Sequence, residues 1–176
     1  SCETPAQISG SINTIKIIRD ENKSSLHGYN TDVIGFERTL KPLLKGRKDI
    51  RAMILGTGGS ANSVAYVLRK LGILFCFISR NPSKLLHSRY TWIDSTDLTN
   101  NHLIINTTPV GMFPQDENYP CLPYKYISDK HILYDLIYNP NETIFLKNGR
   151  EQGATCINGR KMLEIQANAS RDIWNK

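Results

Sequence analysis

The chain has 176 residues, of which 40% are hydrophobic and 22% are charged, a composition that excludes a disordered or collagen-like protein. No apolar run approaches the ~20 residues that a membrane-spanning helix needs and no signal-peptide pattern opens the chain, so we expect a soluble protein without a membrane partner. The formal charge of +6 suits an anionic ligand. The basic residues are scattered rather than clustered with aromatic side chains, which argues against nucleic acid as a partner.

The first 31 residues carry short extended patterns. Residues 11–18 resemble a strand, a polar turn follows at 20–25, and residues 26–29 complete a hairpin. From Asp32 the apolar residues recur at helical spacing, and the glycine-containing segment 45–49 ends this helix. We place a domain boundary at the start of the helix.

The middle of the chain alternates strands and helices. Apolar runs at 50–55, 73–78, 103–106 and 132–135 have the length of strands, and the run 73–78 is continuously apolar, as expected for a parallel strand covered on both faces. A helix follows the first run, and Gly72 provides its left-handed C-terminus. The long proline-rich loop between the last two runs is a candidate for function. Residues 161–174 are helical again. The alternation of strands and helices predicts an α/β fold, a doubly wound parallel sheet with flanking helices.

The four cysteines form no Cys-x-x-Cys motif and no Cys/His cluster (Cys2, Cys76, Cys121 and Cys156). We therefore expect neither a metal site nor a disulfide scaffold, and a reduced, cytoplasmic setting is the simplest interpretation. Cys76 lies in the apolar run 73–78 and is expected to be a buried thiol.

The strongest local signal is the glycine-rich segment 56–61 between the first middle strand and its helix. Its glycines allow a tight turn and a close backbone approach to a pyrophosphate, while the N–H groups at the helix start face the anion. A structural glycine turn is the alternative, but the strand–turn–helix context favours a dinucleotide site. The expected cofactor-binding residues of this turn are Gly56, Thr57, Gly58, Gly59, Ser60 and Ala61.

The end of the next strand bears on which dinucleotide binds. An NAD site usually places Asp or Glu there to accept hydrogen bonds from the ribose 2′-OH. This chain has Ser79, Arg80 and Asn81 instead, with Lys84 one helical turn later and no acidic residue before Asp94. The Arg80 guanidinium can pair with a 2′-phosphate, which a carboxylate would repel. The sequence therefore favours NADP over NAD, with an ordinary surface arginine as the alternative.

Taken together, these motifs resemble the shikimate dehydrogenase family, and the matching runs follow one another over nearly the whole chain. They are Ile12-Asn-Thr-Ile15, Gly28-Tyr-Asn-Thr-Asp32, Gly35-Phe36, Gly56-Thr-Gly-Gly-Ser-Ala61, Ser79-Arg80-Asn81, Ile105-Asn-Thr-Thr-Pro-Val-Gly-Met112, Tyr134-Asp-Leu-Ile-Tyr-Asn-Pro140 and Asn158-Gly-Arg-Lys-Met-Leu163 with Gln166. The resemblance implies NADP-dependent, reversible reduction of 3-dehydroshikimate to shikimate in chorismate and aromatic amino-acid biosynthesis. It also implies three parts: a remnant of an N-terminal substrate-binding domain (1–31), a Rossmann-like NADP-binding domain (32–157) and a C-terminal helix returning to the substrate domain (158–176).

The resemblance also assigns site residues. It implies a catalytic Lys–Asp pair at the reacting oxygen of the substrate, with Asp32 as the aspartate, and substrate contacts from Asn13, Asp32, Tyr138 and Gln166. From the pattern alone, Asp32 would be a helix N-cap, Asn13 a strand-end asparagine, and Tyr138 and Gln166 a core-edge tyrosine and a polar helix residue. Further cofactor contacts are implied at Asn106, Thr107, Met112, Ile137 and Gly159.

The chain departs from the family pattern at its start. Family members begin with a substrate-binding lobe that carries a serine pair for the substrate carboxylate and the catalytic lysine in a Val-Thr-x-Pro-x-Lys segment, which this sequence lacks. Lys16 and Lys23 match no catalytic position. We expect a fragment that binds NADP(H) but has little or no dehydrogenase activity alone. Its exposed sheet edges and unpartnered C-terminal helix should leave apolar surface for self-association, such as a homodimer.

Two alternative functions stay open. One is a quinate/shikimate dehydrogenase that uses NAD or NADP, because the residues that would separate the two acids belong to the missing lobe. The other is a non-catalytic nucleotide-binding or regulatory module, for which the missing lysine is the only positive evidence. The expected partner of an enzyme of this family is a small molecule, shikimate or 3-dehydroshikimate.

Overall fold

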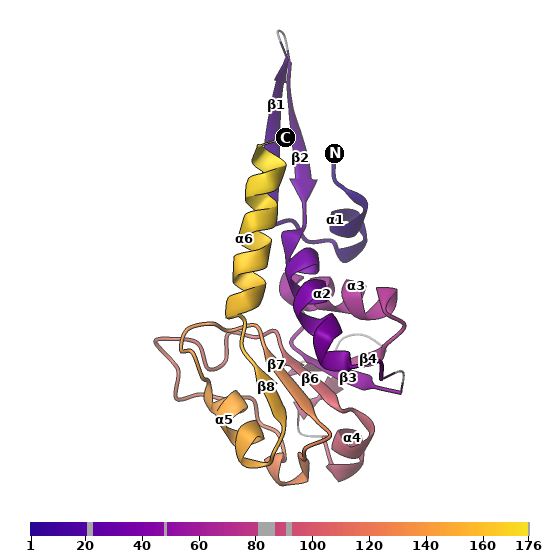
Figure 1. Ribbon diagram of the computed structural model, residues 1–176, viewed down its shortest axis with the longest axis vertical. Helices are drawn as coiled ribbons and strands as arrows, with labels where there is room; N and C mark the ends of the chain where they lie inside the picture. Colours follow the sequence, from indigo (N-terminus) through magenta and orange to yellow (C-terminus); the bar gives the residue numbers. More distant parts are fainter. Residues whose placement is uncertain (21–22, 48, 81–86, 91–92, 176) are drawn as a thin grey trace.

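The protein consists of a parallel sheet wrapped by helices, from which a hairpin and a long helix project (Figure 1). The computed structural model describes residues 1–20, 23–47, 49–80, 87–90 and 93–175, and the statements below concern these residues. Within them, no helix is both long enough and apolar enough to cross a bilayer.

The elements follow one another in this order: α1 (Thr4–Ser9), β1 (Thr14–Asp20), β2 (Lys23–Tyr29), α2 (Thr31–Leu44), β3 (Arg51–Leu55), α3 (Gly59–Lys70), β4 (Leu74–Ser79), β5 (His87–Arg89), α4 (Ser95–Asn100), β6 (Leu103–Asn106), the 3-10 helix η2 (Tyr124–Tyr126), β7 (Ile132–Asp135), α5 (Ile144–Glu151), β8 (Thr155–Ile157) and α6 (Arg160–Trp174). The hairpin β1–β2, the helices α2, α3 and α6, and the strands β3, β4, β6 and β7 lie where the sequence predicts them. The expectation of extended structure is wrong at 4–9. There a short helix begins at Thr4 with Pro5 in its first turn, and Gly10 ends it with a left-handed φ of 63°.

The large sheet has the strand order β5-β4-β3-β6-β7-β8, with every neighbouring pair parallel. Renumbered along the chain, this is the order 3-2-1-4-5-6 of a doubly wound sheet, so the predicted fold class is confirmed. The winding reverses between β3 and β6. Ligands of such sheets bind in the crevice at the carboxyl ends of the strands on either side of that reversal.

Alternate side chains of the central strands enter two separate cores. Ile54 and Tyr134 face α2 and α3, whereas Met53 and Leu133 face α4, α5 and the segment 107–131. Leu122 of the proline-rich segment is buried in this second core. The length of that segment therefore has a structural reason, because it covers part of the sheet.

The strand β4 corrects two expectations. Its first residue, Leu74, is 65% exposed, and among the described residues β5 pairs with the carboxyl half of β4 and does not reach Leu74. Cys76 is half-buried rather than buried. A continuously apolar run thus does not require cover on both faces along its whole length.

The helix α6 packs along α2 and reaches the hairpin, as Figure 1 shows. Gly35 of α2 permits this approach, because a Cβ there would lie 2.7 Å from the carbonyl oxygen of Met162. At the far end, the Trp174 indole Nε1 donates to the carbonyl oxygen of Ile15 at 3.0 Å. The expectation that the C-terminal helix is unpartnered is therefore wrong.

The exposed apolar surface lies on the hairpin instead. Ile15 and Ile17 of β1 and Leu26 of β2 are each more than half exposed. Ile17 and Leu26 are direct partners in the antiparallel register, so these side chains share one face.

Candidate functional site

The turn between β3 and α3 contains two glycines, Gly56 and Gly58, that have different roles. Gly56 has φ +106°, and a Cβ there would lie 2.8 Å from Thr107 Oγ1 and 2.9 Å from Thr108 Cγ2. A Cβ at Gly58 would meet no atom within 4 Å. A glycine is therefore required at position 56 by its neighbours, whereas the backbone at Gly58 borders open space that a ligand could occupy.

The N-terminus of α3 is available to an anion. Its N-cap, Gly58, offers no side-chain acceptor, and among the described residues no side chain accepts from the N–H groups of the first turn at residues 59–61. Ala61 is fully buried, which allows close packing of the helix on the sheet, while Thr57 is exposed and Ser60 half-buried. The N-terminus of the helix, with the positive end of the helix dipole and backbone N–H donors, fits a pyrophosphate.

The end of β4 lies beside this turn. Leu55 and Ile78 are partners in the parallel register, and the Gly56 N–H donates to the carbonyl oxygen of Ile78 at 2.8 Å. Ser79 and Arg80 follow directly, and the Arg80 side chain is exposed. Burial raises the pKa of the Tyr90 phenol to about 12, and the positive charge of Arg80 opposes that rise.

Two of the residues expected near the 2′-phosphate, Asn81 and Lys84, lie outside the described residues. Of that group, Ser79 and Arg80 are therefore the ones that the structure places.

On the other side of the crevice, the predicted cofactor residues turn their polar groups into the protein. Thr107 Oγ1 donates to the carbonyl oxygen of Leu55 at 2.6 Å, and the buried Asn106 amide donates to Asp135 Oδ1 at 3.0 Å. Met112 projects outward and is 45% exposed. Asn106 and Thr107 thus shape the loop, and Met112 is the member of this group whose side chain reaches the surface.

Gly159 is dictated by a backbone contact. Its N–H donates to the carbonyl oxygen of the buried Ile137 at 2.9 Å, and a Cβ on residue 159 would lie only 1.9 Å from the carbonyl oxygen of Leu136. The chain between β8 and α6 therefore crosses directly over the segment that follows β7.

Three of the predicted substrate residues meet in one hydrogen-bonded cluster. Asn13 Nδ2 donates to Asp32 Oδ1 and to Gln166 Oε1, both at 2.9 Å. Asn13 immediately precedes β1, Asp32 lies in the first turn of α2, and Gln166 lies in α6. The cluster thus joins the hairpin to the two long helices.

Thr31 fixes the orientation of the Asn13 amide. Its backbone N–H, which can only donate, points to Asn13 Oδ1 at 2.9 Å, and its hydroxyl donates to the same oxygen at 3.1 Å. The NH2 group of Asn13 must then face Asp32 and Gln166.

The sequence pattern predicts Asp32 as the N-cap of α2, and this prediction is wrong. Asn30 is the N-cap and accepts from the Val33 N–H at 3.4 Å. Burial raises the pKa of Asp32, and the hydrogen bond from Asn13 opposes that rise. No ion pair within the part of the chain that the structure describes involves Asp32, so its charge is balanced there by the amide and the helix dipole.

A small pocket of about 130 Å³ adjoins this cluster. Asp32 and Gln166 line it from one side and Tyr138, half-exposed, from another, while Ser60 and Gly159 come from the predicted cofactor residues. The structure therefore brings predicted substrate and cofactor residues to one place, although they are far apart in sequence.

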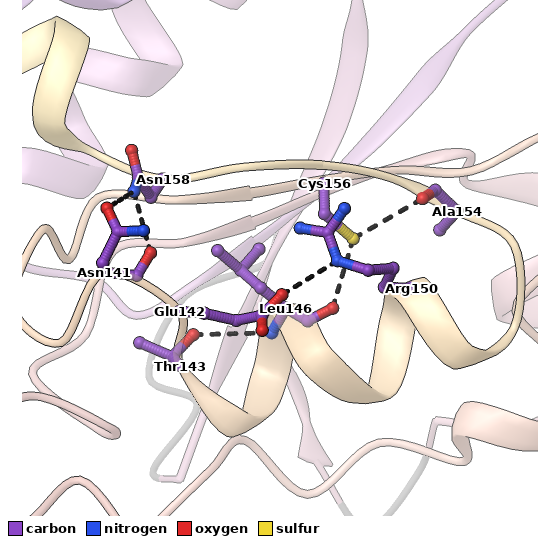
Figure 2. A network of polar contacts seen from close by, with 8 residues as sticks. All are labelled: Asn141, Glu142, Thr143, Leu146, Arg150, Ala154, Cys156 and Asn158. Carbon is purple, nitrogen blue, oxygen red and sulfur yellow. Dashed lines mark hydrogen bonds and ion pairs between the residues drawn. The ribbon is translucent and has the colours of Figure 1, made fainter.

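A larger pocket of about 320 Å³ lies between α5 and β8 and contains no predicted site residue (Figure 2). Its polar groups pair with one another: Arg150 Nε donates to Glu142 Oε1 at 2.8 Å, and Asn158 Nδ2 donates to the Asn141 carbonyl oxygen at 2.8 Å. Burial raises the pKa of the Cys156 thiol, which disfavours its thiolate form. This network ties down the segment just before Gly159.

Sequence reasoning gave no role to three buried polar residues, Asn30, Thr31 and Asp135. Asn30 Nδ2 donates to Ser63 Oγ of α3 at 2.9 Å, so it links the end of the hairpin to α3. The available signal was position, since all three sit at the end of a strand or the start of a helix, where side chains satisfy free backbone groups.

Comparisons with known proteins identify the family of the chain. A scan against protein-family models finds no match. The shikimate dehydrogenase (NADP(+)) of Clostridium botulinum is 37% identical over 177 residues, which cover 97% of this chain and 67% of the relative. The chain belongs to the shikimate dehydrogenase family.

Other members of this family align in the same way. The shikimate dehydrogenase (NADP(+)) of Crocosphaera subtropica is 36% identical over 97% of this chain and 64% of its own length. The crystal structure of the Thermus thermophilus enzyme in complex with NADP(H) and shikimate superposes with a TM-score of 0.79 at 27% identity, covering 98% of this chain and 65% of that one. The chain thus spans about two thirds of the length of these family members.

Proposed function

We propose that this chain forms the cofactor-binding part and one wall of the substrate site of an NADP-dependent shikimate dehydrogenase. One observation carries the proposal: Asp32 and Gln166, which Asn13 joins by hydrogen bonds, line the same pocket as Ser60 and Gly159 of the cofactor side. A substrate bound there would meet neutral amides, a phenol and a carboxylate. These groups suit a polyhydroxylated ring, because each hydroxyl removed from water needs a partner.

The proposal divides the chain into three parts. Residues 1–31 contribute the hairpin and Asn13 to the substrate domain, residues 32–157 form the NADP-binding domain, and residues 158–176 return to the substrate domain. The contacts of α6 with β1 support this division, because Ser170 Oγ lies 2.6 Å from Thr14 Oγ1.

The cofactor side of the proposal rests on backbone groups. The open space at Gly58 and the uncapped first turn of α3 fit a pyrophosphate, and the exposed Arg80 beside them fits a 2′-phosphate. Bound NADPH supplies the hydride for reduction of the substrate carbonyl. Ser60 and Gly159 bring this side to the wall of the substrate pocket.

On the substrate side, Asp32 is proposed as the carboxylate of the catalytic pair. Its raised pKa and partial burial describe a carboxylate that a neighbouring cation would stabilise. A lysine held there would donate a proton to the alkoxide that forms when the carbonyl is reduced. Asn13 and Gln166 would bind substrate hydroxyls, and Tyr138 would close the rim of the pocket.

The first test is a fluorescence titration of the chain with NADPH and with NADH. We expect saturable binding that favours NADPH, because the adenosine end meets Arg80 rather than a carboxylate. A preference for NADH would contradict the assignment of Arg80 and favour an enzyme that uses NAD.

The second test is a turnover assay with shikimate and with quinate, run on the chain and on a form extended by a family substrate lobe. We expect the extended form to oxidise shikimate with NADP+ and the chain to show little or no turnover. A preference for quinate would indicate the quinate/shikimate alternative, and binding of NADPH without turnover in the extended form would indicate a non-catalytic module. Sedimentation of the same samples tests whether the apolar hairpin face leads to a homodimer.

A further inference from the structure

A fully buried carboxylate, Asp135, lies at the carboxyl end of β7 next to the cofactor crevice. It accepts three hydrogen bonds from side chains and backbone of three different segments. Asn106 Nδ2 at 3.0 Å and the Ile137 N–H at 3.1 Å donate to its Oδ1, and Thr143 Oγ1 donates to its Oδ2 at 2.6 Å. Asp135 thus joins the end of β6, the segment after β7 and the N-cap of α5.

The carboxylate, together with the backbone of Thr108 and Val110, determines which way the Asn106 amide points. An ionised carboxylate can only accept, so the NH2 group of Asn106 must face Asp135. The Asn106 oxygen is then free to accept from the N–H of Thr108 at 3.1 Å and from its hydroxyl at 2.7 Å. The same NH2 group donates to the Val110 carbonyl oxygen at 3.2 Å, so one amide fixes the fold of residues 106–110.

This loop forms the back of the glycine turn. The Thr107 N–H and hydroxyl both donate to the carbonyl oxygen of Leu55, at 3.0 and 2.6 Å. Thr107 and Thr108 also occupy the space where a Cβ on Gly56 would lie. A shift of the loop would therefore move the turn that leads into α3.

A second branch runs from Asp135 to the pocket. Ile137 makes two hydrogen bonds with its backbone. Its N–H donates to Asp135, and its carbonyl oxygen accepts from the N–H of Gly159. Tyr138 and Gly159 both line the small pocket, so this hydrogen bond anchors part of its wall.

We propose that Asp135 is a positioning residue of the cofactor site, which orients the Asn106 amide and anchors Ile137 so that the loop 106–110 supports the Gly56 turn. This inference rests on the proposed function, and Asp135 itself does not contact the cofactor. An apolar side chain of the same volume would fill the space but would leave the three donors without an acceptor.

The electrostatics around Asp135 agree with this role. Burial raises its pKa to about 6, and the hydrogen bonds from Thr143, Ile137 and Asn106 oppose that rise. The charge of Asp135 acts in turn on the Tyr124 phenol, whose pKa is raised by burial, by Tyr119 and by Asp135. No cation forms an ion pair with Asp135 among the described residues, so the three donors are what keep it charged at neutral pH.

The experiment compares the NADPH dissociation constants of three variants at pH 7.5. Asp135→Leu removes every acceptor and should weaken binding by about tenfold or more. Asp135→Asn keeps an oxygen for Asn106 and Ile137 while its NH2 group donates to Thr143, so binding should stay within about threefold of the wild type. Leu133→Ala is the control, since it opens a cavity on the same strand without touching the loop; it should lower the melting temperature and leave the dissociation constant within about twofold.

The ¹⁵N-resolved side-chain NH2 signals of Asn106 give a second readout that does not need cofactor. They should shift with a midpoint near pH 6 in the wild type and not in Asp135→Asn, because the carboxyl that titrates is gone. Should Asp135→Leu fail to fold, Asn106→Leu breaks the same link from its other end and carries the same expected loss of affinity.

The possible failures are distinguishable. A wild-type chain that does not bind NADPH overturns the proposed function and, with it, the cofactor role of Asp135. Normal wild-type binding that is unchanged in a folded Asp135→Leu variant overturns the positioning role alone. An equal loss of affinity in Leu133→Ala would also overturn it, because general destabilisation would then explain the effect.

Discussion

The two halves of the site are built in opposite ways. The glycine turn uses six consecutive residues and works through backbone groups, with Gly58 open and the first turn of α3 uncapped. The cluster around Asn13 uses side chains that lie 19 and 153 residues away from it along the chain. The first half depends on the absence of side chains and the second on their presence, so substitutions should affect the two halves differently.

The largest effect is expected where backbone meets backbone. Gly159→Ala would place a methyl group 1.9 Å from the Leu136 carbonyl oxygen. Because neither chain segment can yield without moving β7 or α6, the free energy of unfolding should fall by more than about 4 kcal/mol, as measured by urea denaturation. Gly58→Ala is the matched control: the methyl enters open space, so stability should change by no more than about 1 kcal/mol while NADPH binding weakens. Equal stability of the two variants would show that the crossing at residue 159 is not tight.

The side-chain half is tested by Asn13→Leu. This substitution leaves the buried Thr31 N–H without an acceptor and removes a donor from Asp32, which should lower the free energy of unfolding by about 2–3 kcal/mol. It should also raise the pKa of Asp32 further, because the hydrogen bond that opposes burial is lost. Denaturation and a carboxyl ¹³C titration measure both effects.

Asn168→Leu, at an exposed position of α6, is the control for Asn13→Leu and should alter neither quantity. An unchanged Asp32 titration in Asn13→Leu would contradict the proposed geometry of the cluster.

A pH experiment tests Asp135, whose side chain supports the half of the site that contains the glycine turn. The folded-state pKa of Asp135 is about 6, above the value of 3.8 for an unperturbed carboxyl, so the folded chain binds more protons between these values. Lowering the pH from 7.5 to 5 should therefore stabilise the wild type by about 1–1.5 kcal/mol relative to Asp135→Asn. Chemical denaturation of both proteins at each pH gives the difference, which cancels the other titrating groups. A difference that does not vary with pH would mean that Asp135 titrates normally.

The smallest effect concerns the 2′-phosphate. Arg80→Ala should weaken NADPH binding by about three- to fivefold and leave NADH binding unchanged, since exposed charge pairs are screened by solvent. Arg38→Ala, on the exposed side of α2, should affect neither nucleotide. Fluorescence titrations at low and high salt measure the selectivity, and its loss in both variants would point to the overall positive charge rather than to Arg80.

The same contrast explains what the sequence could predict. The glycine turn, the doubly wound order and the strands β3, β6 and β7 follow from local patterns, because strand length, helical spacing and glycine positions act within a few residues. The helix α1 also has local signals, Pro5 in its first turn and Gly10 at its end, but they are weaker than the extended patterns around them. The exposed start of β4 could not be found in this way, because it depends on which segments cover the strand in the tertiary fold.

The Asn13 cluster shows the limit most clearly. The resemblance to a family named Asn13, Asp32 and Gln166, but nothing in their local patterns indicates that one amide bridges the other two. The pattern also favoured Asp32 as the N-cap, whereas the structure gives that role to Asn30, two residues earlier. Both residue types are good caps, and the choice between them depends on where the hairpin releases the chain.

Both amide hydrogens of Asn13 are already engaged, one with Asp32 and one with Gln166. A hydroxyl that arrives at Asn13 must therefore take the place of an internal partner, so binding there is an exchange and not a net gain of one interaction. A ring that lacks this hydroxyl leaves Asn13 fully satisfied and loses little affinity on its account. Discrimination against deoxygenated analogues must then come from other groups of the pocket, with Tyr138 at its rim as the first candidate.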